Sequence, residues 1–288
     1  ARDPRDGTLW ASLDHGHWGP KLSRSRDGGS TWEDVLSLKY PEGARHIIQY
    51  LPTPDFDPEA PAGEPQYKDA TVYKIWSIAF GPATQPGRLY AGTIPGGLFV
   101  SDDGGDSWEL NRPLWNHESR GGDLFKGEAT STTHWGGTPA SIDYGVFEPG
   151  IHSIVIDPRN ADHLYVAVSS AGILETKNGG KTWVGRNKGM RVDYLPDPEA
   201  EWGHDPHFVT ACRDQPDHVW QQNHFGVYYS DNGAQSWNKV SLPDAGVHFG
   251  FPIAVDAQDG RTAWVVPARA DSERMALDGG LFVARTSD

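Results

Sequence analysis

The chain has 288 residues, a net charge of −14 and a single cysteine. The acidic charge argues against nucleic acid and anionic membranes as partners, and one cysteine excludes an intrachain disulfide. There is also no apolar run long enough to span a bilayer.

The composition favours an all-β soluble protein. The 34 glycines and 22 prolines punctuate turns, and the 12 tryptophans favour strands. Cys212 lies in an apolar run, so we expect a buried structural thiol rather than a reactive one. A single cysteine fits the cytoplasm and is compatible with export as well.

Four eight-residue strings recur in chain order. They read SRDGGSTW at 25–32, SDDGGDSW at 101–108, TKNGGKTW at 176–183 and SDNGAQSW at 230–237. The Asp or Asn at the third position can accept from backbone N–H groups just ahead, and the glycines supply positive φ. The closing tryptophan begins the next strand and reaches the core. We therefore interpret these residues as turn and core residues, not as catalytic ones: Ser25, Asp27, Gly29, Trp32, Ser101, Asp103, Gly105, Trp108, Thr176, Asn178, Gly180, Trp183, Ser230, Asn232 and Trp237.

Thr286-Ser-Asp288 resembles the start of a fifth string. Three strand-like segments precede each of these four later strings, and the first segment covers 76–80, 152–157, 207–211 and 251–256 in successive units. With the strand after the string, a unit reads A–B–C–string–D, which is a four-stranded antiparallel propeller blade. We expect one β-propeller domain over 1–288, with blade parts at 1–38, 75–110, 151–185, 207–242 and 251–288.

The strings resemble the BNR/Asp-box propeller family, whose pattern is S-x-D-x-G-x-x-W. The third string departs from it at Thr176 and Asn178, and the fourth at Asn232 and Ala234, which leaves the fourth turn open to distortion. The resemblance implies a sialidase-like or glycosyl hydrolase-like propeller, of the WD40/YVTN type. The first unit lacks strand A and the last stops after strand C, so we expect these roughly five blades to belong to a longer, seven-bladed ring.

The blades of a propeller surround a central channel. We place the candidate site at the mouth of this channel, on the face opposite the strings. Long D–A insertions at 33–74, 109–150 and 184–206 should rise over that mouth. His152 and His207 share one repeat position at the entrance of strand A, which Trp76 and Phe251 fill in other units. The tentative ligand-binding residues are His17, His152, Glu201, His204, His207, Asn223 and His224.

Three interpretations of the mouth remain open. His152, His207 and His224 could bind a divalent metal ion with Glu201 or Asp205. Alternatively, a histidine and a carboxylate could perform acid–base chemistry, or the histidines could line a hydrated channel. No HExxH motif supports the metal.

Three functions match these interpretations. The resemblance implies a carbohydrate-active hydrolase, which needs two carboxylates. Its pair is not identifiable among eight mouth candidates: Asp14, Asp123, Glu128, Glu148, Asp193, Asp197, Glu201 and Asp205. The Arg-Ile-Pro motif of true sialidases is absent from the sequence. The alternatives are a non-catalytic propeller that binds a protein or small ligand, and a metal-dependent enzyme.

Overall fold

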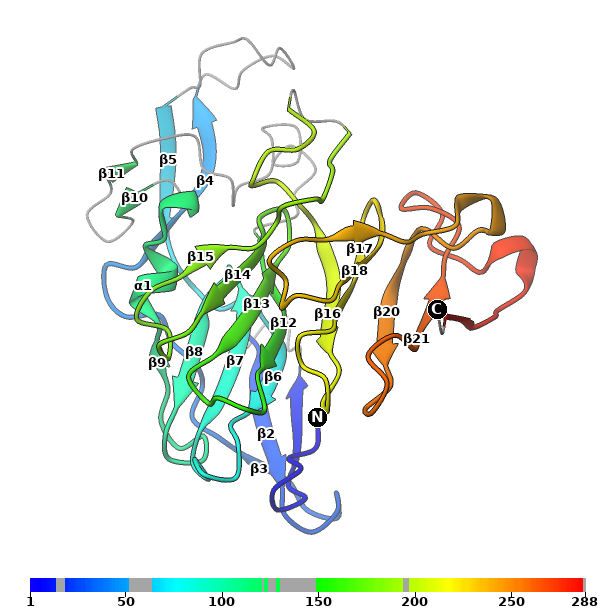
Figure 1. Cartoon of the computed structure of the whole chain (residues 1–288). Helices are drawn as coiled ribbons and strands as arrows, with labels where there is room; N and C mark the ends of the chain where they lie inside the picture. Colours follow the sequence, from blue (N-terminus) through cyan, green and yellow to red (C-terminus); the bar gives the residue numbers. More distant parts are fainter. Residues whose placement is uncertain are drawn as a thin grey trace.

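The computed structural model describes residues 1–13, 19–51, 64–120, 122–123, 128–129, 149–193 and 197–286 (Figure 1). Three of its sheets have four antiparallel strands in chain order. They are β6 (Lys74–Phe80), β7 (Leu89–Ile94), β8 (Leu98–Ser101) and β9 (Glu109–Leu110); β12 (Ile151–Ile156), β13 (Leu164–Val168), β14 (Gly172–Thr176) and β15 (Val184–Gly185); and β16 (Pro206–Ala211), β17 (Val219–Asn223), β18 (Gly226–Ser230) and β19 (Asn238–Lys239).

Two three-stranded sheets flank these in the sequence. They are β1 (Leu9–Leu13), β2 (Lys21–Ser25) and β3 (Glu33–Asp34) at the start, and β20 (Gly250–Val255), β21 (Ala263–Pro267) and β22 (Ala284–Thr286) at the end. The remaining elements are the hairpins β4 (Arg45–Leu51)–β5 (Glu64–Asp69) and β10 (Gly122–Asp123)–β11 (Glu128–Ala129), the short helix α1 (Arg112–Trp115), and the 3-10 turns η1 (Glu118–Arg120), η2 (Pro243–Ala245) and η3 (Leu277–Gly279).

The first strands of successive sheets are neighbours in space. β6 contacts β12, β12 contacts β16, and β16 contacts β20. The core lies between the sheets: Tyr165 and Ile173 of one sheet pack with Tyr228 of the next. This arrangement of antiparallel sheets, joined through their first strands, is a β-propeller. In the described residues, no helix is long and apolar enough to cross a membrane.

Each repeated string forms the turn before the last strand of its sheet: β2–β3 in the first sheet, and β8–β9, β14–β15 and β18–β19 in the three four-stranded sheets. In the first turn, Ser25 Oγ accepts from Gly29 N at 2.8 Å and Asp27 Oδ1 accepts from Thr31 N at 2.9 Å. The fourth turn keeps this pattern, because Ala234 adopts a φ of 60° and its N–H donates to Ser230 Oγ at 3.0 Å. The alanine therefore does not distort the turn. In Figure 1 the β2–β3 turn lies at the lower end of the molecule, and the hairpins β4–β5 and β10–β11 lie at the upper end.

The prediction that every closing tryptophan is a core residue is wrong for Trp32. Trp183 and Trp237 are buried, Trp108 is half-buried, but Trp32 is 48% exposed. Trp237 reaches the preceding sheet, where its Nε1 donates to Arg186 O at 2.8 Å. Trp32 belongs to the first sheet of the chain, and its Nε1 donates to Gly29 O in its own turn. Trp237 is thus buried by its contacts with the preceding sheet. Cys212 is buried, as expected.

Candidate functional site

One repeat position at the start of the first strands carries an aromatic or imidazole ring in four successive sheets. Trp76, His152, His207 and Phe251 each fall where the pairing register of their strand shifts. Such a β-bulge inserts an extra residue and re-aims its side chain. These four residues are called the ring position below.

The rings of this position contact one another in pairs across neighbouring sheets. Trp76 and His152 have ring centroids 3.7 Å apart. The rings of His207 and Phe251 are stacked at 4.7 Å with an interplanar angle of 18°. The first pair lies on β6 and β12 and the second on β16 and β20. Because β12 also contacts β16, the two pairs are neighbours. The four rings therefore follow one another along the inner strands.

Asp205 lies between two imidazoles. Its Oδ2 is 3.6 Å from His207 Nε2 and 3.6 Å from His224 Nδ1, although His207 lies on β16 and His224 in the β17–β18 turn. The backbone holds this arrangement, since His224 N donates to Asp205 O at 2.9 Å. Ser170 N, from the preceding sheet, donates to Asp205 Oδ1 at 3.3 Å. We call Asp205, His207 and His224 the Asp–His–His cluster.

The charges of the cluster follow from its contacts. Burial acts to raise the pKa of Asp205, but interaction with His207 and His224 outweighs it and holds that pKa well below its usual range. The Asp205 carboxylate in turn raises the pKa of His224. Burial lowers the pKa of the neighbouring His152 to about 4. At neutral pH, Asp205 is therefore ionised and His152 is neutral.

The other residues expected at the site lie elsewhere. His204 is fully buried, and its Nε2 contacts Ala200 O at 2.8 Å. Asn223 is buried as well, and its Oδ1 accepts from Phe225 N in the β17–β18 turn. Glu201 is exposed, with its Oε1 3.4 Å from Asn187 Nδ2. His17 lies outside the described residues, as do Asp14 and Glu148.

Asp205 lies at the centre of the cluster, whereas the sequence predicts it only as an alternative metal ligand to Glu201. The sequence feature that favours Asp205 over Glu201 is its short spacing from His207. Asp205 stands two residues before His207, so a short bulged segment brings both side chains to one place. His152 contributes a neighbouring ring, but its ligand atoms do not join the cluster in which all ligand atoms lie within 4.8 Å of one another.

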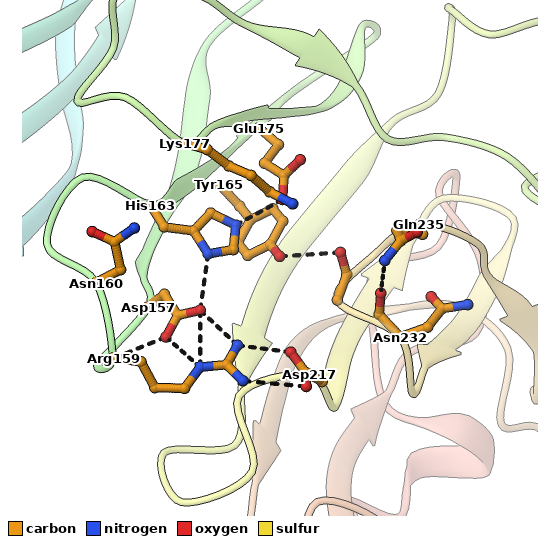
Figure 2. A pocket seen from close by; sticks show the side chains of 11 residues that line it. Asp157, Arg159, Asn160, His163, Tyr165, Glu175, Lys177, Asp217, Asn232 and Gln235 are labelled. Carbon is orange, nitrogen blue, oxygen red and sulfur yellow. Dashed lines mark hydrogen bonds and ion pairs between the residues drawn. The ribbon is translucent and has the colours of Figure 1, made fainter.

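A pocket of about 290 Å³ lies away from the ring position, beside the string that closes the β18–β19 hairpin. Figure 2 shows His163 between two carboxylates: its Nδ1 is 2.9 Å from Asp157 Oδ2 and its Nε2 is 2.7 Å from Glu175 Oε1. Arg159 in turn joins Asp157 to Asp217, a residue of the next sheet.

The same arginine arrangement occurs in the first sheet. Arg5 pairs with Asp3 at 2.6 Å, and its Nη1 donates to the carbonyl groups of Gln85 and Arg88 in the next sheet. Both arginine–aspartate pairs come from the same tripeptide, Asp-Pro-Arg, which occurs at 3–5 and at 157–159. Because the arrangement recurs where one sheet meets the next, we interpret this pocket as a structural junction.

The comparisons with known proteins agree with the fold. No family model matches the chain. The oligoxyloglucan-reducing end-specific xyloglucanase of Emericella nidulans is 24% identical over 199 residues, which are 68% of this chain and 20% of that protein. The chain thus spans about a fifth of this relative.

Solved structures of GH74 enzymes are similar to the whole chain. The enzyme of Niastella koreensis has a TM-score of 0.60 at 17% identity and covers 99% of this chain and 36% of its own. An ancestral GH74 enzyme scores 0.57 at 16% identity, over 100% and 29% of the two chains. The xyloglucanase of Xanthomonas campestris scores 0.51 at 18%, over 98% and 38%. At these identities the likeness shows the propeller fold alone.

Proposed function

We propose that this chain is a carbohydrate-binding propeller of the glycoside hydrolase type, with the sugar bound at the ring position. The observation that carries the proposal is the two exposed rings of the ring position, of which Phe251 stacks on His207 of the Asp–His–His cluster and Trp76 contacts the neighbouring His152. Trp76 is 37% exposed and Phe251 is 38% exposed, at equivalent places in their sheets. Large apolar ring faces beside a few polar groups are typical of small-molecule sites.

The charge of the protein favours a neutral sugar. A net charge of −14 repels anionic ligands such as sialic acids, whereas it leaves neutral oligosaccharides unaffected. The names of the relative and of one structural neighbour refer to xyloglucan, which supports trying its oligosaccharides first. Protein binding and sialidase activity receive no comparable support from the described residues.

Hydrolysis of the bound sugar is a separate question from its binding. A glycosidase uses two carboxylates on either side of the glycosidic bond. In the part of the chain that the structure describes, the cluster contains one carboxylate, Asp205, and two imidazoles contact it. This composition favours sugar binding over two-carboxylate hydrolysis. Release of new reducing ends from a bound oligosaccharide tests the catalytic part directly.

The variant Trp76→Ala is expected to weaken binding of neutral oligosaccharides by about two- to tenfold, because it removes one ring face worth roughly 0.5–1.5 kcal/mol. Isothermal titration calorimetry with a panel that includes xyloglucan oligosaccharides measures the change. Trp32→Ala is the matched control, since Trp32 is more exposed but lies in the β2–β3 turn.

Two results would contradict the proposal. One is a wild-type protein that binds no oligosaccharide of the panel. The other is an equal loss of affinity in the Trp76→Ala and Trp32→Ala variants, which would place the sugar away from the ring position. Binding without release of reducing ends leaves a non-catalytic carbohydrate-binding propeller.

A further inference from the structure

We propose that Asp205, His207 and His224 hold a divalent first-row transition metal ion, such as zinc. The inference goes beyond carbohydrate binding and does not depend on it. One carboxylate and two imidazoles form a ligand set that suits such ions and leaves coordination positions open for water or substrate.

The distances fit a metal site. Oδ2 of Asp205 lies 3.6 Å from a ring nitrogen of each histidine, and all three ligand atoms lie within 4.8 Å of one another. With metal–ligand bonds of about 2.1 Å, a tetrahedral site separates its ligand atoms by about 3.4 Å. Small side-chain adjustments therefore bring the three atoms to coordination distance.

The tautomer of His207 presents a lone pair to the cluster. Its Nδ1 lies 2.6 Å from Gly250 O, and because a carbonyl oxygen only accepts, Nδ1 carries the proton. Nε2 is then the ring nitrogen that offers a lone pair, and it faces Asp205 Oδ2 at 3.6 Å. A metal ion between these two atoms would bind both of them.

The surroundings hold His207 in place, as the outer partners of metal ligands do. Its ring stacks on Phe251 and meets Phe249 edge-on at 5.4 Å. The side chains of Asp205, His207 and His224 are 26%, 6% and 28% exposed. The site is thus rigid at its base and open to solvent through the other two ligands.

A second observation comes from His152 on the neighbouring strand. Its Nε2 is buried and has no hydrogen-bond partner among the described residues. A buried polar atom left in this way costs about 1–3 kcal/mol. Its strand β12 contacts β16, which carries His207. We therefore assign this Nε2 as an acceptor for water held at the site.

Titration of EDTA-treated full-length protein with Zn²⁺ and Co²⁺, without sugar, tests the inference. Calorimetry should give one site with a Kd of about 1 µM or tighter. The visible absorption of bound Co²⁺ should report four or five ligands. Asp205→Asn and His224→Ala should each weaken binding about a hundredfold, because each removes one of three ligands.

His218→Ala is the matched control, because this half-buried histidine lies at the far end of the β16–β17 hairpin. It should bind zinc like the wild type. Absence of binding by the folded wild-type protein would overturn the inference. Wild-type affinity in Asp205→Asn and His224→Ala would overturn it as well. Asp205→Asn is nearly isosteric and decides the matter if His224→Ala does not fold.

Discussion

Replacing Trp237 with alanine is expected to lower the free energy of unfolding by about 4 kcal/mol. Trp237 is 3% exposed and packs with Tyr228 and Val219 of its own sheet and Tyr165 of the preceding one. Its backbone N–H also donates to Lys188 O at 2.9 Å, which joins the two sheets. The variant opens a cavity at this junction. Equilibrium unfolding in urea measures the loss.

Trp32→Ala provides the comparison within the same repeat. Trp32 is 48% exposed, and its Nε1 bonds to its own turn, so the expected loss is below about 1 kcal/mol. The difference between the two variants isolates the contribution of a preceding sheet. Equal losses would show that the tryptophan stabilises its own turn rather than the junction between sheets.

Acidification is expected to remove about 3 kcal/mol of stability through Glu175 alone. The side chain is 2% exposed, and burial acts to raise its pKa. Bonds from His163 at 2.7 Å and Arg186 at 2.6 Å outweigh burial and lower the pKa from 4.5 to about 2. Because the folded pKa lies below the unfolded one, this stabilisation is complete above pH 4.5. It is lost as the pH falls from 4.5 towards 2.

The variant Glu175→Gln tests this assignment. It should be less stable than the wild type at pH 7 and should lose about 3 kcal/mol less between pH 4.5 and 2. Urea unfolding at several pH values measures both effects. Glu273→Gln is the control, since Glu273 is half-exposed in its pair with Arg269 and should change stability by less than about 1 kcal/mol. A wild-type pH dependence in Glu175→Gln would contradict the assignment.

Local patterns in the sequence were sufficient to predict the propeller and the ring position. Ser25 and Asp27 bond to backbone groups within four residues, so their turn is encoded in one short string. His152 and His207 stand at the same distance from the end of their strands, and period-two alternation gives them the same facing. Such features depend on neighbours in the chain, and repeats display them several times.

Contacts between segments far apart in the chain were decided only by the tertiary structure. Asp205 meets His224 because the end of a long loop lies against the β17–β18 turn, whereas His204, one residue earlier, is buried away from it. Trp237 is buried against the preceding sheet, whereas Trp32 is exposed and bonds within its own turn. The strings at 25–32 and 230–237 share the same turn pattern and both end in tryptophan. The packing of neighbouring sheets supplies the difference, because burial is a property of the assembled core and not of the string.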